Sequence, residues 1–238
     1  MNMNVNFQPS FLGLKTFKHN NVRLLEPYTA ISRDSKKLNL TARFEPVNNM
    51  FETIVTADHR NFDWIGYSQY SINKNYMYIE SMHTDSFERD IGIGTCLHLN
   101  NIIEMLKNNV DLIELSASAP AIPFHIRFGF MPCDVWTDNM VRNLRHLASN
   151  KDYRFKKFSE DAKFILSNQY SNDLKARLAN QLIADYVNES LACKTTDELK
   201  QLMRSPTKMS LTRSDVFKNK DFYNKLLKKY NIDYKIEG

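Results

Sequence analysis

The sequence has few of the residues that mark several large classes of protein. Its 238 residues include only three cysteines, six glycines and seven prolines. Cys96, Cys133 and Cys193 are odd in number and far apart, which excludes a disulfide framework and indicates a reducing compartment. The low glycine and proline contents exclude collagen and argue against a long disordered tail.

Segments that would send the chain into or across a membrane are also missing. No run approaches the ~18 apolar residues that span a bilayer. Residues 1–7 lack the basic and apolar regions of a secretory signal. We therefore expect a cytoplasmic protein, with secretion into another cell by a different route left open. The six histidines form no metal-binding pair, so we expect no metal.

The composition that remains is that of a globular protein, with its charge unevenly placed. Hydrophobic residues make up 42% and charged residues 25% of the chain, and the net charge is +5. Residues 151–238 hold 18 Lys and Arg against 12 Asp and Glu, whereas residues 1–150 hold 14 against 15. We predict a first domain over residues 1–158 and a basic extension over residues 159–238.

The predicted extension reads as helical throughout. Apolar residues recur at three- and four-residue steps over 174–187 and 222–230, and residues 195–198 have the pattern of a capping box. We favour a helical subdomain with a solvated basic face. The alternative is a recognition surface for an acidic partner, which would be RNA, an acidic protein or an anionic membrane.

The middle of the chain predicts strands followed by a crossover. Residues 51–57, 64–72 and 76–84 read as an antiparallel meander with short loops. A glycine turn at Gly92 and Gly94 then opens a helix that runs to about residue 107, and residues 111–116 read as a strand. A strand–helix–strand crossover places its two strands parallel.

A glycine turn at the start of a helix presents free backbone N–H groups to an anion such as a phosphate. Two common phosphate motifs do not fit, because the turn has no Gly-Lys-Ser/Thr and Leu97 stands where a dinucleotide fingerprint needs glycine. A flexible entry to the helix is the alternative interpretation.

Two patterns together resemble one family. Arg89, Gly92 and Gly94 form R-x-x-G-x-G, which resembles the pyrophosphate motif of the GNAT superfamily of acyl-CoA-dependent N-acetyltransferases. Residues 121–130 resemble that family's closing helix and turn, with His125 where a tyrosine is common. The resemblance covers roughly residues 50–133, and residues 1–49 fit it poorly.

The resemblance implies an α/β fold with a mixed, mostly antiparallel sheet, a splayed parallel central pair and an all-helical C-terminal extension. Residues 130–136 and 153–158 would be its last strands, with a helical insertion over 139–149. It also implies that acetyl-CoA binds to the turn and the strand before it. The residues involved would be Met82, Thr84, Arg89, Asp90, Ile91, Gly92, Ile93, Gly94 and Thr95, with Ser118 beside the pantetheine unless it serves only packing.

The family's reaction needs a base for the attacking amine and an acid for the leaving thiolate. Glu80 is the predicted base, partly desolvated on its strand, and Glu114 is the second candidate; an ordinary solvent-facing glutamate is the alternative for Glu80. His125 is the predicted acid by position. It could instead only hydrogen-bond, act as the base or be a satisfied helix residue. Cys96 reads as a core residue.

The predicted function is therefore transfer of an acetyl group from acetyl-CoA to an amine, by direct attack in a ternary complex. The long extension favours a protein or other macromolecule as acceptor. The alternative is a catalytically degenerate module that binds acyl-CoA and uses its basic tail for an acidic partner. A longer acyl donor is a third possibility, and the sequence does not predict the oligomeric state.

Overall fold

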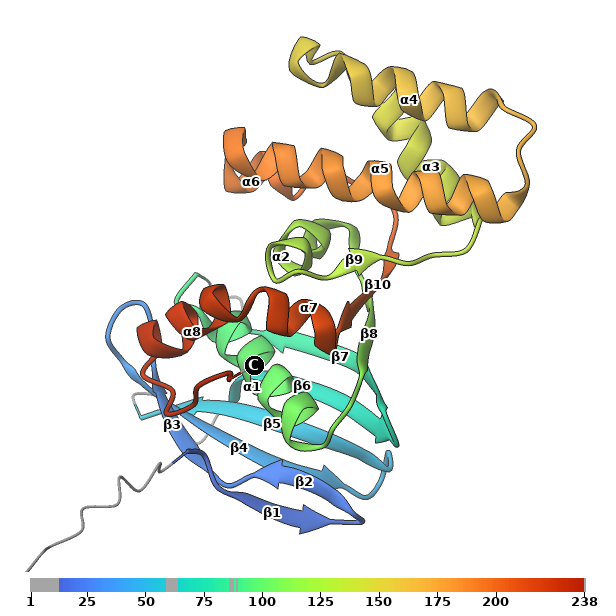
Figure 1. The fold of residues 1–238 in the computed structure, drawn as a ribbon. Coiled ribbons are helices and arrows are strands. Elements are labelled where there is room, and N and C mark those ends of the chain that lie inside the picture. The colour runs from blue at the N-terminus through green and yellow to red at the C-terminus, as the bar shows by residue number, and fades with distance from the viewer. Residues whose placement is uncertain (1–12, 59–63, 86–87, 89, 238) are drawn as a thin grey trace, which may run out of the picture. The chain divides into compact units, whose positions relative to one another are not determined.

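The computed structural model describes residues 13–58, 64–85, 88 and 90–237 (Figure 1). The chain forms two compact units. The first consists of residues 1–68, 83–108 and 220–238, and the second of residues 69–82 and 109–219. The compact units therefore follow different boundaries from the predicted regions 1–158 and 159–238.

The main sheet is mixed, as the sequence predicts. Its eight strands have the order β3-β4-β5-β6-β7-β8-β10-β9. The β3–β4, β4–β5, β8–β10 and β10–β9 pairs are antiparallel, whereas β7 and β8 are parallel. The strands are β3 (Tyr28–Ile31), β4 (Lys37–Glu45), β5 (Met50–Ala57), β6 (Trp64–Asn73), β7 (Tyr76–Thr84), β8 (Leu112–Ala117), β9 (Met131–Pro132) and β10 (Thr207–Thr212).

The parallel pair has a limited register. It runs from Tyr76 opposite Leu112 to Ile79 opposite Leu115, whereas β7 itself continues to Thr84. Met77, Ile79, Ile113 and Leu115 are all buried, so the paired part of β7 and β8 lies within the core.

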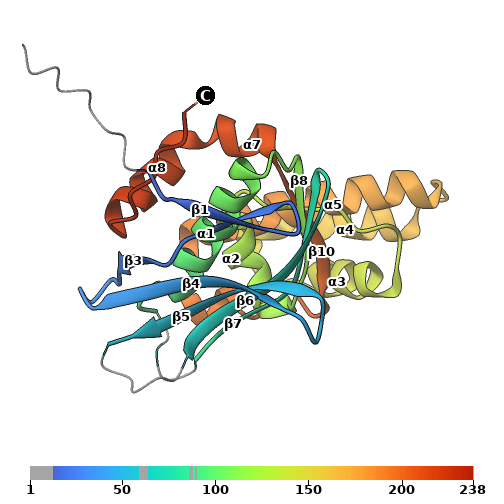
Figure 2. The ribbon, with the colours of Figure 1, turned by 90° about the horizontal axis from the view of Figure 1, so that it is seen from below.

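In the first unit, helix α1 (Ile93–Lys107) provides most of the core. It contacts β2 and β5, and its buried residues include Cys96, Ile102 and Ile103. A separate hairpin of β1 (Thr16–His19) and β2 (Val22–Leu25) lies along this helix (Figures 1 and 2). The helix also buries amides that bond across to the sheet, since Asn100 donates to the Thr53 hydroxyl at 2.9 Å.

The end of the chain completes the same unit. Helix α8 (Lys220–Lys229) buries Tyr223 and Leu227, and Tyr230 follows it with 1% of its surface exposed. The side chain of Asn224 bonds to both the N–H and the C=O of Ile236, at 2.9 and 3.1 Å. These bonds fold the last residues back onto the helix.

The second unit combines the central strands with helices. Helix α2 contacts α5, and helices α3, α4 and α5 pack against one another (Figure 1). Its helical elements are η2 (Ala119–Ala121), α2 (Ile122–Arg127), α3 (Asp138–Ala148), η3 (Tyr153–Phe155), α4 (Lys156–Ser167), α5 (Asn172–Cys193), α6 (Thr196–Leu199) and α7 (Arg213–Lys218).

Two predicted features of this part of the chain are wrong. Residues 153–158 form η3 and the start of α4, not a strand. The extension is also not all-helical, because β10 pairs with β8 over six residues. Thr207, Met209 and Leu211 are buried, and the residues between them are more exposed, so burial in β10 alternates with the two-residue period of a strand. The segments before and after β10 have helical patterns, and for this reason the sequence did not indicate a strand here.

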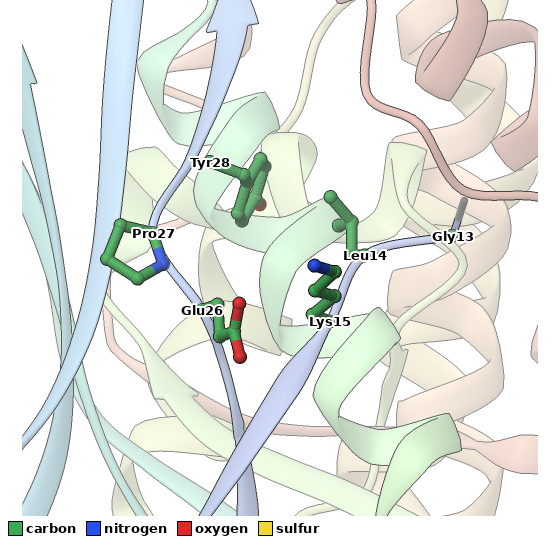
Figure 3. A pocket seen from close by; sticks show the side chains of 6 residues that line it. All are labelled: Gly13, Leu14, Lys15, Glu26, Pro27 and Tyr28. Atoms are coloured by element: carbon green, nitrogen blue, oxygen red, sulfur yellow. The ribbon is translucent and has the colours of Figure 1, made fainter.

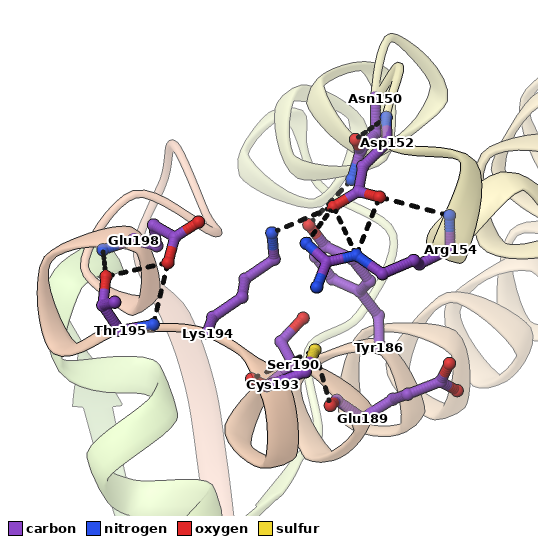
Figure 4. A network of polar contacts seen from close by, with 10 residues as sticks. All are labelled: Asn150, Asp152, Arg154, Tyr186, Glu189, Ser190, Cys193, Lys194, Thr195 and Glu198. Atoms are coloured by element: carbon purple, nitrogen blue, oxygen red, sulfur yellow. Dashed lines mark hydrogen bonds and ion pairs between the residues drawn. The ribbon is translucent and has the colours of Figure 1, made fainter.

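A polar network explains why residues 150–155 do not extend into a strand (Figure 4). Asp152 caps the turn through the N–H of Arg154 at 3.2 Å, and the Arg154 guanidinium returns to the same carboxylate at 2.6 Å. Lys194, which follows α5, reaches it at 3.4 Å, and Asn150 donates to the Tyr186 hydroxyl at 3.0 Å. These contacts tie the start of α4 to α5, and they hold the pKa of Asp152 well below its usual range.

Candidate functional site

The glycine turn before α1 has the geometry of an anion site. Gly92 is the N-cap residue and has φ 99° and ψ 12°, a left-handed conformation that favours glycine. The first helical bond runs from the Cys96 N–H to the Gly92 C=O at 3.0 Å. The amides just before Cys96 therefore have no acceptor within the helix, and they lie at the positive end of its dipole.

The start of α1 differs from those of α3, α5 and α7. In the part of the chain that the structure describes, it shares with α2 and α4 the lack of a side-chain cap and of an acidic first-turn residue, but the N-cap residue of α1 is a glycine in the left-handed conformation. Within the described residues, α1 has neither a side chain that caps it nor an acidic residue in its first turn. Helices α3, α5 and α7 each have a capping hydroxyl and an acidic first-turn residue. The amides of α1 are therefore not satisfied by the capping that serves those helices, which suits an external anion.

The predicted cofactor residues fall into three groups. Asp90 to Thr95 form the turn and the start of α1, as expected, whereas Arg89 lies outside the described residues. Met82 and Thr84 lie near the end of β7 and are partly buried. Ser118 follows β8 and is exposed, so packing does not account for it.

The sequence did not single out two residues that contact the turn. The Arg33 side chain donates from Nη1 to the Asp90 C=O at 3.2 Å, and the Tyr230 ring packs against Gly92. Arg33 lies 57 positions before Asp90, and Tyr230 lies about 140 positions after Gly92. No sequence motif connects either residue to the turn. Only the folded chain brings these three segments together.

The two predicted carboxylates have different surroundings. Glu80 is exposed on β7, so the partial desolvation expected of it is wrong. Glu114 on β8 is more enclosed, with 15% of its side chain exposed. Its Oε2 accepts a hydrogen bond from the Tyr76 hydroxyl at 2.8 Å and an ion pair from Lys208 at 2.8 Å.

The surroundings of Glu114 shift the pKa values of three neighbouring side chains, those of Tyr76, Lys208 and Cys133. Burial, followed by the hydrogen bond to Glu114, raises the pKa of Tyr76 above its usual value. The bond to Glu114 also raises the pKa of Lys208. Cys133 Sγ lies 4.0 Å from the other carboxylate oxygen, and burial raises the pKa of this thiol. Glu114 is thus a carboxylate that already accepts two donors, which makes it less available as a base than Glu80.

His125 is buried in α2, with 5% of its surface exposed. Its ring lies 5.5 Å from the ring of Phe124 and 5.8 Å from that of Phe130. Burial lowers the pKa of His125 to about 4, so the imidazole is neutral at pH 7. A protonated imidazole acid, as the sequence predicts, does not fit this environment; a neutral N–H donor does.

Among the residues that the structure describes, the other reactive groups form no competing site. Burial raises the pKa of Cys96 to about 12, in keeping with a core thiol. The described residues contain no group of three His, Cys, Asp or Glu placed to hold a metal ion. An open pocket of about 240 Å³ is lined by Gly13, Leu14, Lys15, Glu26, Pro27 and Tyr28 (Figure 3), none of which is a predicted site residue. No helix in the described part of the chain has the length and apolarity to cross a membrane.

No family model and no curated protein matches this chain. Solved structures do match, at low identity. Naa50 from Arabidopsis thaliana, bound to a bisubstrate analogue, is 24% identical over 37% of this chain and 61% of its own, with a TM-score of 0.33. The PaiA N-acetyltransferase from Thermoplasma acidophilum, in complex with coenzyme A, is 21% identical over 37% of this chain and 54% of its own, with a TM-score of 0.33.

A ribosomal-protein alanine N-acetyltransferase from Escherichia coli is 14% identical over 68% of each chain, with a TM-score of 0.37. The matching structures include an acetyltransferase of the GNAT family. The chain spans about three fifths of the length of several of these proteins.

Proposed function

We propose that this chain is an N-acetyltransferase that transfers an acetyl group from acetyl-CoA to an amine. One observation carries the proposal: β7 leads into a left-handed glycine turn at the uncapped start of α1, and the chain returns in β8, parallel to β7. This arrangement is what the R-x-x-G-x-G resemblance leads us to expect.

The turn suits the pyrophosphate of coenzyme A. The amides of Ile93, Gly94 and Thr95 precede the first helical bond, and the positive dipole end of a 15-residue helix favours negative charge there. Met82 and Thr84 are the proposed main-chain contacts for the acyl and pantetheine part, with Ser118 as a further polar contact.

The proposed chemistry is direct transfer in a ternary complex. The neutral amine forms a bond to the thioester carbonyl carbon, the carbon–sulfur bond breaks, and the amine proton passes to a base while the thiolate leaves. Glu80 is the proposed base, because it is exposed and Glu114 already accepts two donors. His125 is proposed to offer a neutral N–H to the leaving sulfur rather than a full proton.

We further propose that the acceptor is a protein or another macromolecule, in the cytoplasm. The proposal of a macromolecular acceptor rests on the long segment beyond residue 158, because the fold alone does not determine the substrate. For the compartment, the support is chemical: Cys96, Cys133 and Cys193 are all described and all unpaired.

Calorimetry and thiol release test the proposal together. The chain should bind coenzyme A and should release thiol from acetyl-CoA in the presence of lysine peptides or other amines. Glu80→Gln should lower kcat with little change in coenzyme A affinity, whereas Glu114→Gln should mainly lower stability. Absence of coenzyme A binding would refute the proposal. Equal loss of kcat in both variants would refute the choice of Glu80.

A second candidate function is an acyl-CoA-binding module that performs no transfer and uses its basic residues for an acidic partner. The observation that favours it is His125, because a buried neutral imidazole stands where the resemblance leads us to expect a tyrosine acid. Tight coenzyme A binding without thiol release from any amine would select this function.

A further inference from the structure

The proposed pyrophosphate turn is held by a loop far from it in sequence. The Arg33 N–H, between β3 and β4, donates to the Ile91 C=O at 2.8 Å. The Arg33 side chain donates from Nη1 to the neighbouring Asp90 C=O at 3.2 Å. One residue therefore fixes two successive carbonyl groups of the turn.

These bonds also orient the turn's donors. In a trans peptide the C=O and the following N–H point in opposite directions. Because the carbonyls of Asp90 and Ile91 point toward Arg33, the N–H groups of Ile91 and Gly92 point away from it. The loop thus presets the direction of two amides immediately before the helix.

Tyr230 supports the turn from another side. If Gly92 carried a Cβ, that atom would lie 2.5 Å from the Tyr230 hydroxyl oxygen and 2.8 Å from Cζ. The ring therefore fills the space that a side chain at position 92 would take. Gly92 is required both by its φ of 99° and by this ring.

Tyr230 is itself fixed at both ends. Its hydroxyl accepts a hydrogen bond from Arg33 Nε at 3.1 Å, and its C=O accepts one from the Ile31 N–H at 2.8 Å. With 1% of its surface exposed, the side chain has little freedom to move. Arg33, Tyr230 and the turn are therefore connected to one another by hydrogen bonds and packing.

We propose that Arg33 and Tyr230 are positioning residues for the pyrophosphate of coenzyme A. The inference rests on the proposed function. A turn whose amides are already oriented loses less conformational freedom on binding, so its affinity for the anion is higher. The end of the chain, which the family resemblance does not cover, is by this inference part of the cofactor site.

The test compares two ligands and two variants. Tyr230→Phe removes the hydroxyl that Arg33 holds and keeps the ring, while Arg33→Met removes the side-chain bonds and keeps the backbone bond to Ile91. Each should weaken coenzyme A binding roughly fivefold to tenfold, as expected for one or two lost hydrogen bonds. Pantetheine, which lacks the pyrophosphate, should bind both variants as it binds the wild type.

Tyr186→Phe is the matched control, because it removes another buried tyrosine hydroxyl, bonded to Asn150 at 3.0 Å, in the second unit. It should lower the melting temperature and leave coenzyme A affinity unchanged. Arg33 is exposed, so its variant should fold even if Tyr230→Phe does not.

The outcomes separate this inference from the proposed function. Normal coenzyme A binding by folded Arg33→Met would overturn the positioning roles while leaving the proposed function intact. Equal weakening for coenzyme A and pantetheine would also overturn them, since it would indicate a general loss of structure. A wild type that binds no coenzyme A would overturn both.

Discussion

The two compact units use the end of the chain in different ways. The first unit takes α8 and the residues after it into its core, where Tyr223, Leu227, Tyr230, Ile232 and Ile236 are all buried. The second takes β10 as a strand of the sheet, with Met209 and Leu211 buried. The last 80 or so residues are therefore divided between two cores, and position in the sequence is a poor guide to the domain that a residue stabilises.

Removing residues 219–238 should have the largest effect. The deletion takes five buried apolar side chains from the first unit, and each is worth about 1.5–3 kcal/mol of burial, which together is comparable to the whole stability of a typical domain. We expect no cooperative unfolding of the first unit by circular dichroism and hydrogen exchange. Normal protection of α1 in the truncated chain would contradict the division between the units.

A second variant of residues 219–238 changes the charge of α8 and leaves its buried side chains in place. Lys225, Lys228 and Lys229 are exposed on α8, so replacing all three with glutamine should leave the fold intact. If the basic face binds an acidic partner, this variant loses the partner while keeping its melting temperature. The truncation would lose both.

Met209→Ala should destabilise the second unit by about 3 kcal/mol, because it leaves a cavity at a fully buried strand position. Urea unfolding would measure the change. The neighbouring Lys208→Ala is the control: its side chain is 45% exposed and its ion pair with Glu114 is worth about 1 kcal/mol or less. Similar losses from both variants would show that β10 is not part of the core.

The elements of the middle of the chain could be predicted because local sequence determines them. Alternation located β5, β6 and β7 to within about a residue or two, and helical spacing located α1. Strand β10 could not be found in this way, because six residues with weak alternation become a strand only when β8 is there to pair with them. The prediction of a strand over residues 153–158 was wrong because aromatic residues are enriched in strands, whereas here the contacts of Asp152 with Arg154 and Lys194 hold the segment in a turn and a helix.

In the candidate site, too, the features set by local sequence could be predicted and those set by folding could not. The turn could be predicted, because a left-handed backbone position favours glycine and glycine can be recognised in the sequence. The surroundings of Glu80, Glu114 and His125 were not, because exposure and pKa depend on residues brought in by folding. Lys208, for example, reaches Glu114 across 94 positions in the sequence.

His125 should make the second unit sensitive to acid. Its pKa is about 4 when folded and 6.5 when unfolded, so between these values the unfolded chain binds the proton more tightly. The stabilising contribution is complete above pH 6.5 and is lost as the pH falls toward 4. Between pH 7 and pH 5 the wild type should lose about 2 kcal/mol that His125→Gln does not lose.

Urea unfolding of both proteins at several pH values measures this difference. The matched control is the His83→Gln variant, because it makes the same substitution at a histidine that is exposed on β7. Parallel pH profiles for His125→Gln and the wild type would contradict the assignment of a buried neutral imidazole.

The smallest expected effect concerns the capping box of α6, which precedes β10 in the second unit. The Thr195 hydroxyl accepts from the Glu198 N–H at 3.4 Å, and Glu198 Oε2 accepts from the Thr195 N–H at 2.8 Å. Thr195→Ala removes the first bond and also the bond that the Thr195 hydroxyl donates to Glu198 Oε2 at 2.8 Å. It should cost about 1 kcal/mol, or about 2–4 °C in melting temperature. Thr196→Ala, one position later inside the helix, is the control and should change little. Because α6 is only four residues long, this cap fixes the direction in which the chain leaves α5 toward Leu199 and then β10. An equal effect of the two alanine variants would mean that packing of Leu199, and not the cap, sets that direction.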